Sequence, residues 1–232
     1  MRHRIFLIII GLLLLNFSFG QILIDAVSGE ISKDTVMDVD GNIYHTVKIG
    51  NQIWMVENLK TTKYRDGTEI SNVSDTSAWS ELTTGAYSDY FNKPDNTEKY
   101  GRLYNWFAVD NSRKICPEGW HVPTYSEWES LKNTINNNSN NNEAKEYKGW
   151  WSYRINGDSL LPIDYRDSKG AFHNEKIQGN IYIGSYGGWW TSTQLDDLTA
   201  WQVSVGFSSY FMLFNKSSKK AGYSVLCIKE AI

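Results

Sequence analysis

The residue types that usually carry catalysis are few and widely spaced in this sequence of 232 residues. Beyond His3, the histidines are His45, His121 and His173, and no two stand four residues apart, as paired zinc ligands on a helix would. The sequence also lacks the Gly-x-Ser-x-Gly motif, the phosphate-binding loop and the dinucleotide-binding glycine motif. We therefore expect no catalytic residue, no metal ligand and no bound cofactor.

Two acidic patterns leave narrower alternatives open. Carboxylate pairs of hydrolases have no fixed spacing, so such a pair stays open among Glu143, Asp164, Asp167 and Glu175. The segment Asp38-Val39-Asp40-Gly41-Asn42 is similar to the start of a calcium loop, but it lacks the further oxygen ligands and the distal glutamate. Because Asp-Gly is also a strong hairpin signal, we interpret this segment as a turn.

The two cysteines, Cys116 and Cys227, are 111 residues apart and belong to no Cys-x-x-Cys motif or Cys/His cluster. In an exported protein two thiols usually pair. We predict a structural disulfide that makes the C-terminal half one closed unit. A catalytic or metal-binding thiol is the alternative.

Aromatic side chains are abundant, with ten Trp, fourteen Tyr and nine Phe. We expect Trp54, Trp106, Trp128, Trp190 and Trp201 to fill the core. Residues 137–188 form the expected variable region, whose part from 143 on has many Gly, Asp and aromatic residues, and large exposed aromatics can stack on a ligand. The candidate ligand-binding residues are Trp150, Trp151, Arg154, Asp164, Tyr165, Arg166, Asp167 and Tyr186. The alternative is that these side chains fill the core or brace the loop internally.

The N-terminus predicts export. Arg2 and Arg4 precede an apolar stretch, and Ser18-Phe19-Gly20 places small residues as a cleavage site requires, so residues 1–20 are interpreted as a secretory signal peptide. After cleavage we expect no membrane span and a location outside the cytoplasm: extracellular, at the cell surface or in the periplasm. A hydrophobic content of 41% and a net charge of −3 indicate a folded domain and argue against a nucleic-acid partner.

The first half of the mature chain predicts strands separated by tight turns, an irregular segment and a short helix. Residues 21–35 are interpreted as a leader, and turns at Asp40-Gly41 and Gly50-Asn51 separate three predicted strands. Residues 61–98 predict an irregular segment with a helical turn at 77–82, and the spacing of Leu103, Trp106 and Phe107 predicts a helix over 100–109.

The second half of the chain predicts one helix, a long loop and final strands. Thr124 and Glu127 form a capping box that begins a helix ending in the asparagine-rich segment 136–142. Residues 137–188 are predicted to be loop. Alternation predicts the last strands, over residues 201–207, 210–214 and 223–227.

Together these motifs resemble the Fibrobacter succinogenes major paralogous domain family, in its order and over about residues 36–230. The longest is Cys-Pro-Glu-Gly-Trp-His-Val-Pro-Thr at 116–124. The other matching segments are 40–44, 52–59, 101–106, 127–128, 190–193 and 222–229. One departure is Leu226, where the family often carries Arg.

The resemblance implies a mixed α+β, C-type-lectin-like fold over residues 36–232: two short helices on a small twisted antiparallel sheet, with a long irregular loop region. It also implies a disulfide between a helix-side segment and the terminal strand. The Glu-Pro-Asn, Gln-Pro-Asp and Trp-Asn-Asp tripeptides of calcium-dependent lectins are absent. The related formylglycine-generating, sulfatase-modifying enzymes use a close cysteine pair near the C-terminus, where this chain has only Cys227.

We therefore expect a secreted, non-enzymatic module that binds an extracellular glycan or surface protein through its 137–188 surface. A structural or assembly subunit of the bacterial cell envelope is the first alternative. An enzyme related to the sulfatase-modifying group is the second.

Overall fold

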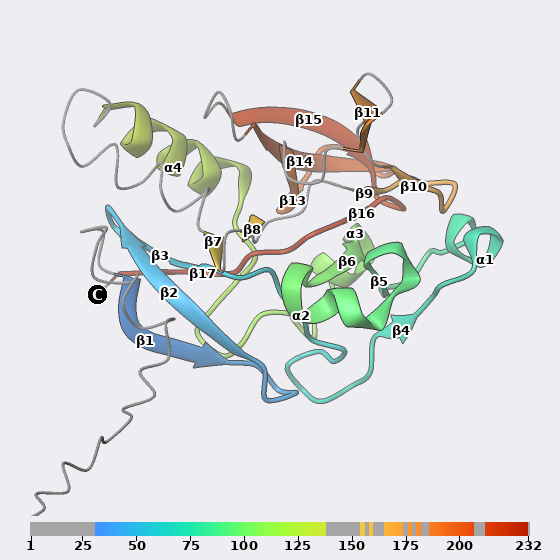
Figure 1. Ribbon diagram of the computed structural model, residues 1–232, viewed down its shortest axis with the longest axis horizontal. Coiled ribbons are helices and arrows are strands. Elements are labelled where there is room, and N and C mark those ends of the chain that lie inside the picture. Colours follow the sequence, from blue (N-terminus) through green and yellow to red (C-terminus); the bar gives the residue numbers. More distant parts are fainter. Residues whose placement is uncertain are drawn as a thin grey trace, which may run out of the picture.

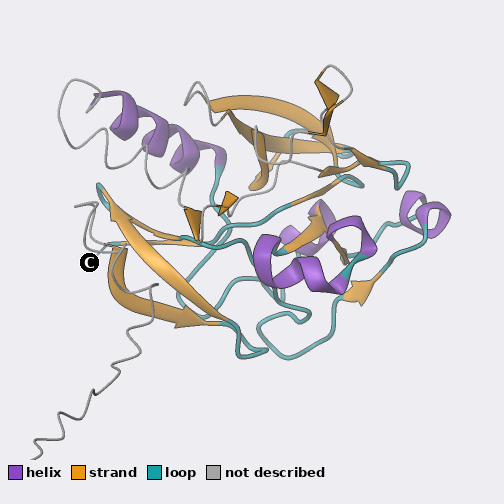
Figure 2. Cartoon of the chain, viewed as in Figure 1, coloured by secondary structure: helices purple, strands orange, loops and turns teal. Residues whose placement is uncertain are grey.

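The computed structural model describes residues 31–137, 154–155, 158–159, 165–173, 176–177, 180–181, 186–206 and 212–231. The predicted signal peptide and most of the predicted leader lie outside these ranges. The fold is sheet-rich, with short helices and mainly antiparallel strands, so the predicted mixed α+β class is confirmed (Figures 1 and 2). No helix within these ranges is long and apolar enough to cross a membrane.

The first sheet joins the two ends of the described chain. Its order is β1 (Ile31–Met37), β2 (Ile43–Ile49), β3 (Gln52–Met55) and β17 (Ile228–Glu230), all antiparallel. The first two connections are the hairpins predicted from Asp40-Gly41 and Gly50-Asn51, and both glycines have positive φ. The last strand thus lies beside β3, as Figure 1 shows.

The second sheet gathers short strands from across the chain. Its order is β10 (Phe172–His173), β9 (Tyr165–Arg166), β16 (Gly222–Tyr223), β6 (Arg102–Asn105), β5 (Ala86–Asp89) and β4 (Ser71–Asn72). Only the β4–β5 pair within this sheet is parallel. Part of the predicted loop region, at 165–173, therefore extends a sheet whose centre is formed by earlier and later segments.

The remaining strands form a three-stranded sheet and two short ribbons. The sheet runs β13 (Tyr186–Gln194), β14 (Thr199–Gly206) and β15 (Met212–Ser218). The ribbons pair β7 (Arg154–Ile155) with β8 (Asp158–Ser159), and β11 (Lys176–Ile177) with β12 (Asn180–Ile181). The predicted strands over 201–207 and 210–214 correspond to β14 and β15 in the described residues.

The helices are short except the last. They are α1 (Thr76–Ser80), α2 (Thr97–Tyr100), α3 (Trp106–Val109) and α4 (Tyr125–Asn137), with 3-10 turns at Tyr90–Asn92 and Pro94–Asn96. The turn predicted at 77–82 is α1. The predicted capping box at the start of α4 is confirmed. The Thr124 backbone N–H donates to the Glu127 carboxylate at 2.7 Å, and the Glu127 N–H donates to Thr124 Oγ1 at 3.2 Å.

The predicted helix over 100–109 is wrong in its first half, where β6 lies. Leu103, Tyr104 and Asn105 are all buried, which a helix with one apolar face would not produce. Asn105 ends the strand and begins α3, because its side-chain oxygen accepts the Ala108 N–H at 3.1 Å. The helical spacing of apolar residues is therefore a coincidence of a strand followed by one helical turn.

The predicted single strand over 223–227 is also wrong. All residues from Tyr223 to Ile228 are buried, including Ser224 and Leu226, because this segment crosses from the second sheet to the first through the core. Its carbonyls accept backbone N–H groups from three separate segments: Trp190 to Ser224 at 3.1 Å, Leu59 to Val225 at 2.8 Å, and Met55 to Cys227 at 3.0 Å. We call residues 223–228 the crossing segment.

Indole rings fill the interior around the crossing segment. Trp54, Trp106, Trp128 and Trp190 are buried as predicted, whereas Trp201 is half-buried. Several indole N–H groups have acceptors: Trp106 donates to the Thr191 carbonyl at 3.0 Å and Trp190 to the Tyr104 carbonyl at 2.8 Å. These bonds remove the cost of burying the polar edge of each ring and fix its orientation.

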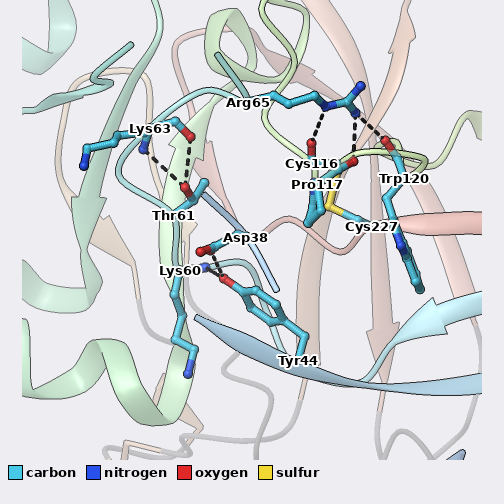
Figure 3. Close-up of a disulfide and its surroundings, with 10 residues drawn as sticks. All are labelled: Asp38, Tyr44, Lys60, Thr61, Lys63, Arg65, Cys116, Pro117, Trp120 and Cys227. Atoms are coloured by element: carbon cyan, nitrogen blue, oxygen red, sulfur yellow. Dashed lines mark hydrogen bonds between the residues drawn. A yellow bond between two sulfur atoms is a disulfide. The ribbon is translucent and has the colours of Figure 1, made fainter. Parts of the chain in front are cut away.

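The predicted disulfide is present between Cys116 and Cys227, with an S–S distance of 2.03 Å and a Cα–Cα distance of 6.0 Å (Figure 3). Both cysteines are buried. The bond ties the segment before α4 to the crossing segment.

Removal of this bond tests its contribution to stability. For a loop of this length, the chain-entropy model gives a loss of about 4–5 kcal/mol of unfolding free energy for the Cys116→Ala/Cys227→Ala variant. Urea unfolding followed by tryptophan fluorescence measures the loss. A reductant should lower the midpoint of the parent protein and leave that of the variant unchanged. An unchanged parent would contradict a structural role.

Candidate functional site

The best-described part of the predicted recognition surface is a hairpin at residues 165–173, which we call the 165–173 hairpin. Strands β9 and β10 pair across it, and the Asp167 side chain accepts the backbone N–H groups of Lys169 and Ala171, both at 2.9 Å. Gly170 occupies the turn with φ +87°, and a Cβ there would lie 2.4 Å from the Thr76 carbonyl oxygen. The turn is therefore closed by its own residues and rests against α1.

Arg166 anchors this hairpin from below and is completely buried. Its guanidinium donates to the carbonyls of Gly170 at 2.9 Å, Ser74 at 2.8 Å and Asp75 at 3.1 Å, and to the Val73 carbonyl. The same group lies over the Trp79 ring, 4.3 Å from its centroid. Burial lowers the pKa of Arg166 to about 10, so the guanidinium stays charged at neutral pH.

The prediction that Arg166 contacts a ligand therefore needs correction. Its side chain joins the hairpin to residues 73–75, the segment leading into α1. The alternative interpretation of the sequence, in which charged residues brace the loop, describes Arg166 correctly.

The outward side of the hairpin carries aromatic rings and one carboxylate. The half-buried Tyr165 ring stacks between His173, at 4.9 Å and 9°, and Tyr223, at 5.2 Å and 13°. Asp167 and His173 Nε2 form a pair at 2.6 Å, with the imidazole 46% exposed. Partial burial opposes ionisation of Asp167, but the hydrogen bonds from His173, Ala171 and Lys169 outweigh it and lower the pKa of this carboxyl.

The other predicted ligand-binding residues are placed only in part. Trp150, Trp151 and Asp164 lie outside the described residues. The backbones of Arg154 and Tyr186 lie in β7 and β13, and their side chains fall outside the description. Of the eight predicted residues, the structure thus brings together Tyr165 and Asp167 at one surface, with Arg166 beneath them.

Sequence reasoning misses His173, which belongs to this surface, and the buried Tyr223, against which Tyr165 stacks. In the sequence His173 stands as an isolated histidine, and Tyr223 as one position of a terminal strand. The Asp167-Ser168-Lys169-Gly170 sequence is a turn signal that places residue 165 opposite 173, so this signal could have located the histidine. No such signal exists for Tyr223, because its contact depends on pairing between distant strands.

The described histidines are all paired with carboxylates. His45 Nδ1 lies 2.6 Å from Glu57, and His121 Nε2 lies 2.7 Å from Glu127. Within the described ranges no group of three or more His, Cys, Asp or Glu residues is arranged to hold a metal ion. The candidate calcium segment is the predicted hairpin turn. There the Asp38 carboxylate accepts from Tyr44 Oη at 2.5 Å and from the Asn42 backbone at 3.0 Å.

The His121–Glu127 pair links the end of the crossing segment, which His121 contacts, to the start of α4. The hydrogen bond to Glu127 raises the pKa of His121. Burial opposes ionisation of Glu127, but hydrogen bonds from His121 and Thr124 outweigh it and lower the pKa of the glutamate. The pair also lies beside the β17 end of the chain, because the His121 and Ile228 backbones exchange two hydrogen bonds of 2.9 Å.

Comparison with known proteins gives one family. The model of the Fibrobacter succinogenes major domain matches residues 47–229. No curated protein and no solved structure matches the chain.

Replacing Arg166 tests its anchoring role. Arg166→Met removes a buried guanidinium that donates hydrogen bonds to four carbonyls, which are then left without this donor. We expect a loss of about 3–5 kcal/mol of unfolding free energy. Arg166→Lys should also destabilise, because one ammonium cannot replace the planar donor fork. The control is Arg113→Gln, at an exposed ion pair, where we expect less than about 0.5 kcal/mol. Equal unfolding midpoints for the Met variant and the control would contradict the anchor.

The His121–Glu127 pair predicts a pH window. Because the pKa of His121 is raised in the folded protein, protonated His121 stabilises the fold fully at pH values below its ordinary pKa of 6.5. This stabilisation is lost as the pH rises through the raised pKa. Because the pKa of Glu127 is lowered in the folded protein, ionised Glu127 stabilises the fold fully at pH values above its ordinary pKa of 4.5. This stabilisation is lost as the pH falls through the lowered pKa. Coupling should therefore peak between pH 4.5 and 6.5.

A double-mutant cycle with His121→Gln and Glu127→Gln measures this coupling, and the glutamine introduced by the second change still suits a capping box. Because both side chains are partly exposed, we expect less than about 1 kcal/mol. The same coupling at pH 5.5 and at pH 9, taken as approximate settings inside and above the window, would contradict the assignment.

Proposed function

Because the chain belongs to the Fibrobacter succinogenes major domain family, and because its 165–173 hairpin is braced from within, we propose that it is a secreted, non-enzymatic recognition module. Its ligand is an extracellular glycan or a surface protein, bound by the surface of residues 137–188. The observation that carries this proposal is the burial of Arg166, which fixes the hairpin so that Tyr165, Asp167 and His173 are presented in one arrangement.

The chemistry of this surface suits recognition. The His173 ring, 46% exposed at the outer end of the stack, offers a flat face to a sugar ring or a side chain, and the neighbouring carboxylate supplies hydrogen-bond acceptors that set orientation. Because the hairpin is held by Arg166 and by the Gly170 contact, little conformational entropy is lost when a ligand binds.

We also propose that the fold is C-type-lectin-like. Three features support this: the terminal strand β17 pairs with the N-terminal hairpin, the disulfide joins the segment before α4 to the region leading into that strand, and a long insertion follows α4. Export is supported by the signal-peptide pattern of residues 1–20 and by the disulfide, which persists in oxidising compartments.

One observation favours assembly as a second function. Met37, Val39 and Ile43 are 62%, 47% and 56% exposed at one end of the β1–β2 hairpin, and β1 is an edge strand of its sheet. Exposed apolar side chains beside an open strand edge are typical of a surface that pairs with another chain. Self-association of the mature protein, measured by sedimentation velocity and abolished by Ile43→Lys, would support this function.

A glycan and protein array probed with the mature chain, with and without EDTA, tests recognition. We expect binding that persists in EDTA and that Tyr165→Ala weakens by up to about tenfold, since this change removes the ring on which the exposed His173 ring stacks. Trp151→Ala tests the part of the surface outside the described residues. The control is Tyr100→Ala, which removes a half-buried tyrosine that packs on Tyr90 and does not belong to this hairpin. Binding unaffected by both surface changes would exclude the proposed site.

A further inference from the structure

A hollow beside the disulfide brings basic side chains together in a protein whose net charge is −3. It has a volume of about 260 Å³, and its lining includes Arg65, Lys114, Cys116, Trp120 and His121. A neighbouring hollow of about 450 Å³ shares Arg65 and Lys114 and adds Arg113. The two hollows are neighbours through these shared residues, and the larger one lies within the range of ligand sites, roughly 300–1,000 Å³. We call them the Arg65–Lys114 groove.

Arg65 is held rigidly at the boundary of the two hollows. Nε donates to the Cys116 carbonyl at 3.0 Å, and Nη2 donates to the carbonyls of Pro117 and Trp120, both at 2.8 Å (Figure 3). These bonds use the Nε hydrogen and both Nη2 hydrogens. Within the described ranges Nη1 faces only Glu118, at 3.3 Å, whose carboxylate side chain is 87% exposed. An N–H of Nη1 is therefore available to an incoming anion.

Lys114 lies beside Arg65 through the backbone, because its carbonyl accepts the Arg65 N–H at 2.8 Å. Its φ is +57°, in the left-handed region that favours glycine, yet the residue is a lysine. Among the described residues its ammonium has no hydrogen-bond or ion-pair partner. Two of the three cations here are paired, Arg65 with Glu118 and Arg113 with Asp66. The positive charge of Lys114 is therefore left without a neighbouring carboxylate among the described residues.

The groove also has an apolar side and hydroxyl groups. The smaller hollow is lined by the edges of Val109, Ile115, Trp120 and Val122, each at most 5% exposed, and by Ser192, while Ser112 lines the larger one. An apolar wall next to fixed cations and hydroxyls suits a ring that has one nonpolar face, several hydroxyl groups and one anionic substituent.

We propose that the Arg65–Lys114 groove binds an acidic sugar, one that carries a carboxylate or a sulfate. Lys114 and the free edge of Arg65 bind the anionic group, and the ring lies against the apolar wall. This site is formed by the disulfide region and not by the 165–173 hairpin, so it goes beyond the recognition proposed for that surface.

Lys114 offers a variant that separates binding from folding. Lys114→Gly removes the ammonium and places glycine where the backbone is left-handed, so its thermal midpoint should equal or exceed that of the parent. Lys48→Gln removes one positive charge from an exposed position on β2 and is the matched control.

Calorimetric titration of the mature protein uses four probes: oligogalacturonate, dextran sulfate, uncharged dextran and polyglutamate. We expect oligogalacturonate or dextran sulfate to bind, dextran not to bind, and polyglutamate to bind more weakly than the acidic sugar. Lys114→Gly should weaken binding at least about tenfold, the effect of losing one charge-assisted contact, and Lys48→Gln should leave it unchanged. Whichever sugar binds identifies the anion as carboxylate or sulfate.

Four results would overturn the proposal: no binding of either acidic sugar, equal weakening by Lys114→Gly and Lys48→Gln, equal binding of dextran, or polyglutamate binding as tight as that of the sugars. Tyr165→Ala should leave this binding intact. A loss confined to Lys114→Gly and a loss confined to Tyr165→Ala therefore report separately on the groove and on the hairpin.

Discussion

The buried crossing segment, residues 223–228, is the constraint on which the rest of the structure depends. A backbone that passes through a protein core must find a partner for each of its polar groups. Here three carbonyls of the segment accept backbone N–H groups from Met55 in β3, from Leu59 just after β3, and from Trp190 in β13. The disulfide at Cys227 then fixes the segment covalently to the region before α4. The three sheets are consequently positioned by one short stretch of chain.

Local signals in the sequence predict local structure well. The capping box at Thr124, the two N-terminal hairpins and the disulfide are predictable because each depends on neighbouring residues or on a pair without competitors. The helix over 100–109 and the terminal strand fail because burial on all sides overrides periodicity, and burial is decided by distant segments. The prediction that Arg166 contacts a ligand needs correction for the same reason, since the carbonyls that accept from its Nη groups lie 91 to 93 residues earlier in the chain.

Arg166 and Arg65 both hold a loop through hydrogen bonds to backbone carbonyls, but they differ in how far they are exposed. Arg166 is fully buried and uses its donor fork to hold the 165–173 hairpin to the segment before α1. Arg65 is partly exposed and holds the loop of Cys116, Pro117 and Trp120, while one edge of its guanidinium stays open. In both cases a planar group with five N–H donors satisfies carbonyls that turns leave unpaired, which a lysine could not do. Rigid loops then need no regular secondary structure of their own.

The pairing of β17 with β3 has a consequence for folding. The first sheet keeps an open edge at β3 until residues 228–230 reach it from a distant part of the chain. Its closure joins the two ends of the described chain, a contact of high sequence separation that forms slowly. A folding intermediate in which β17 has not yet docked therefore exposes the β3 edge, which could pair with a strand of another chain.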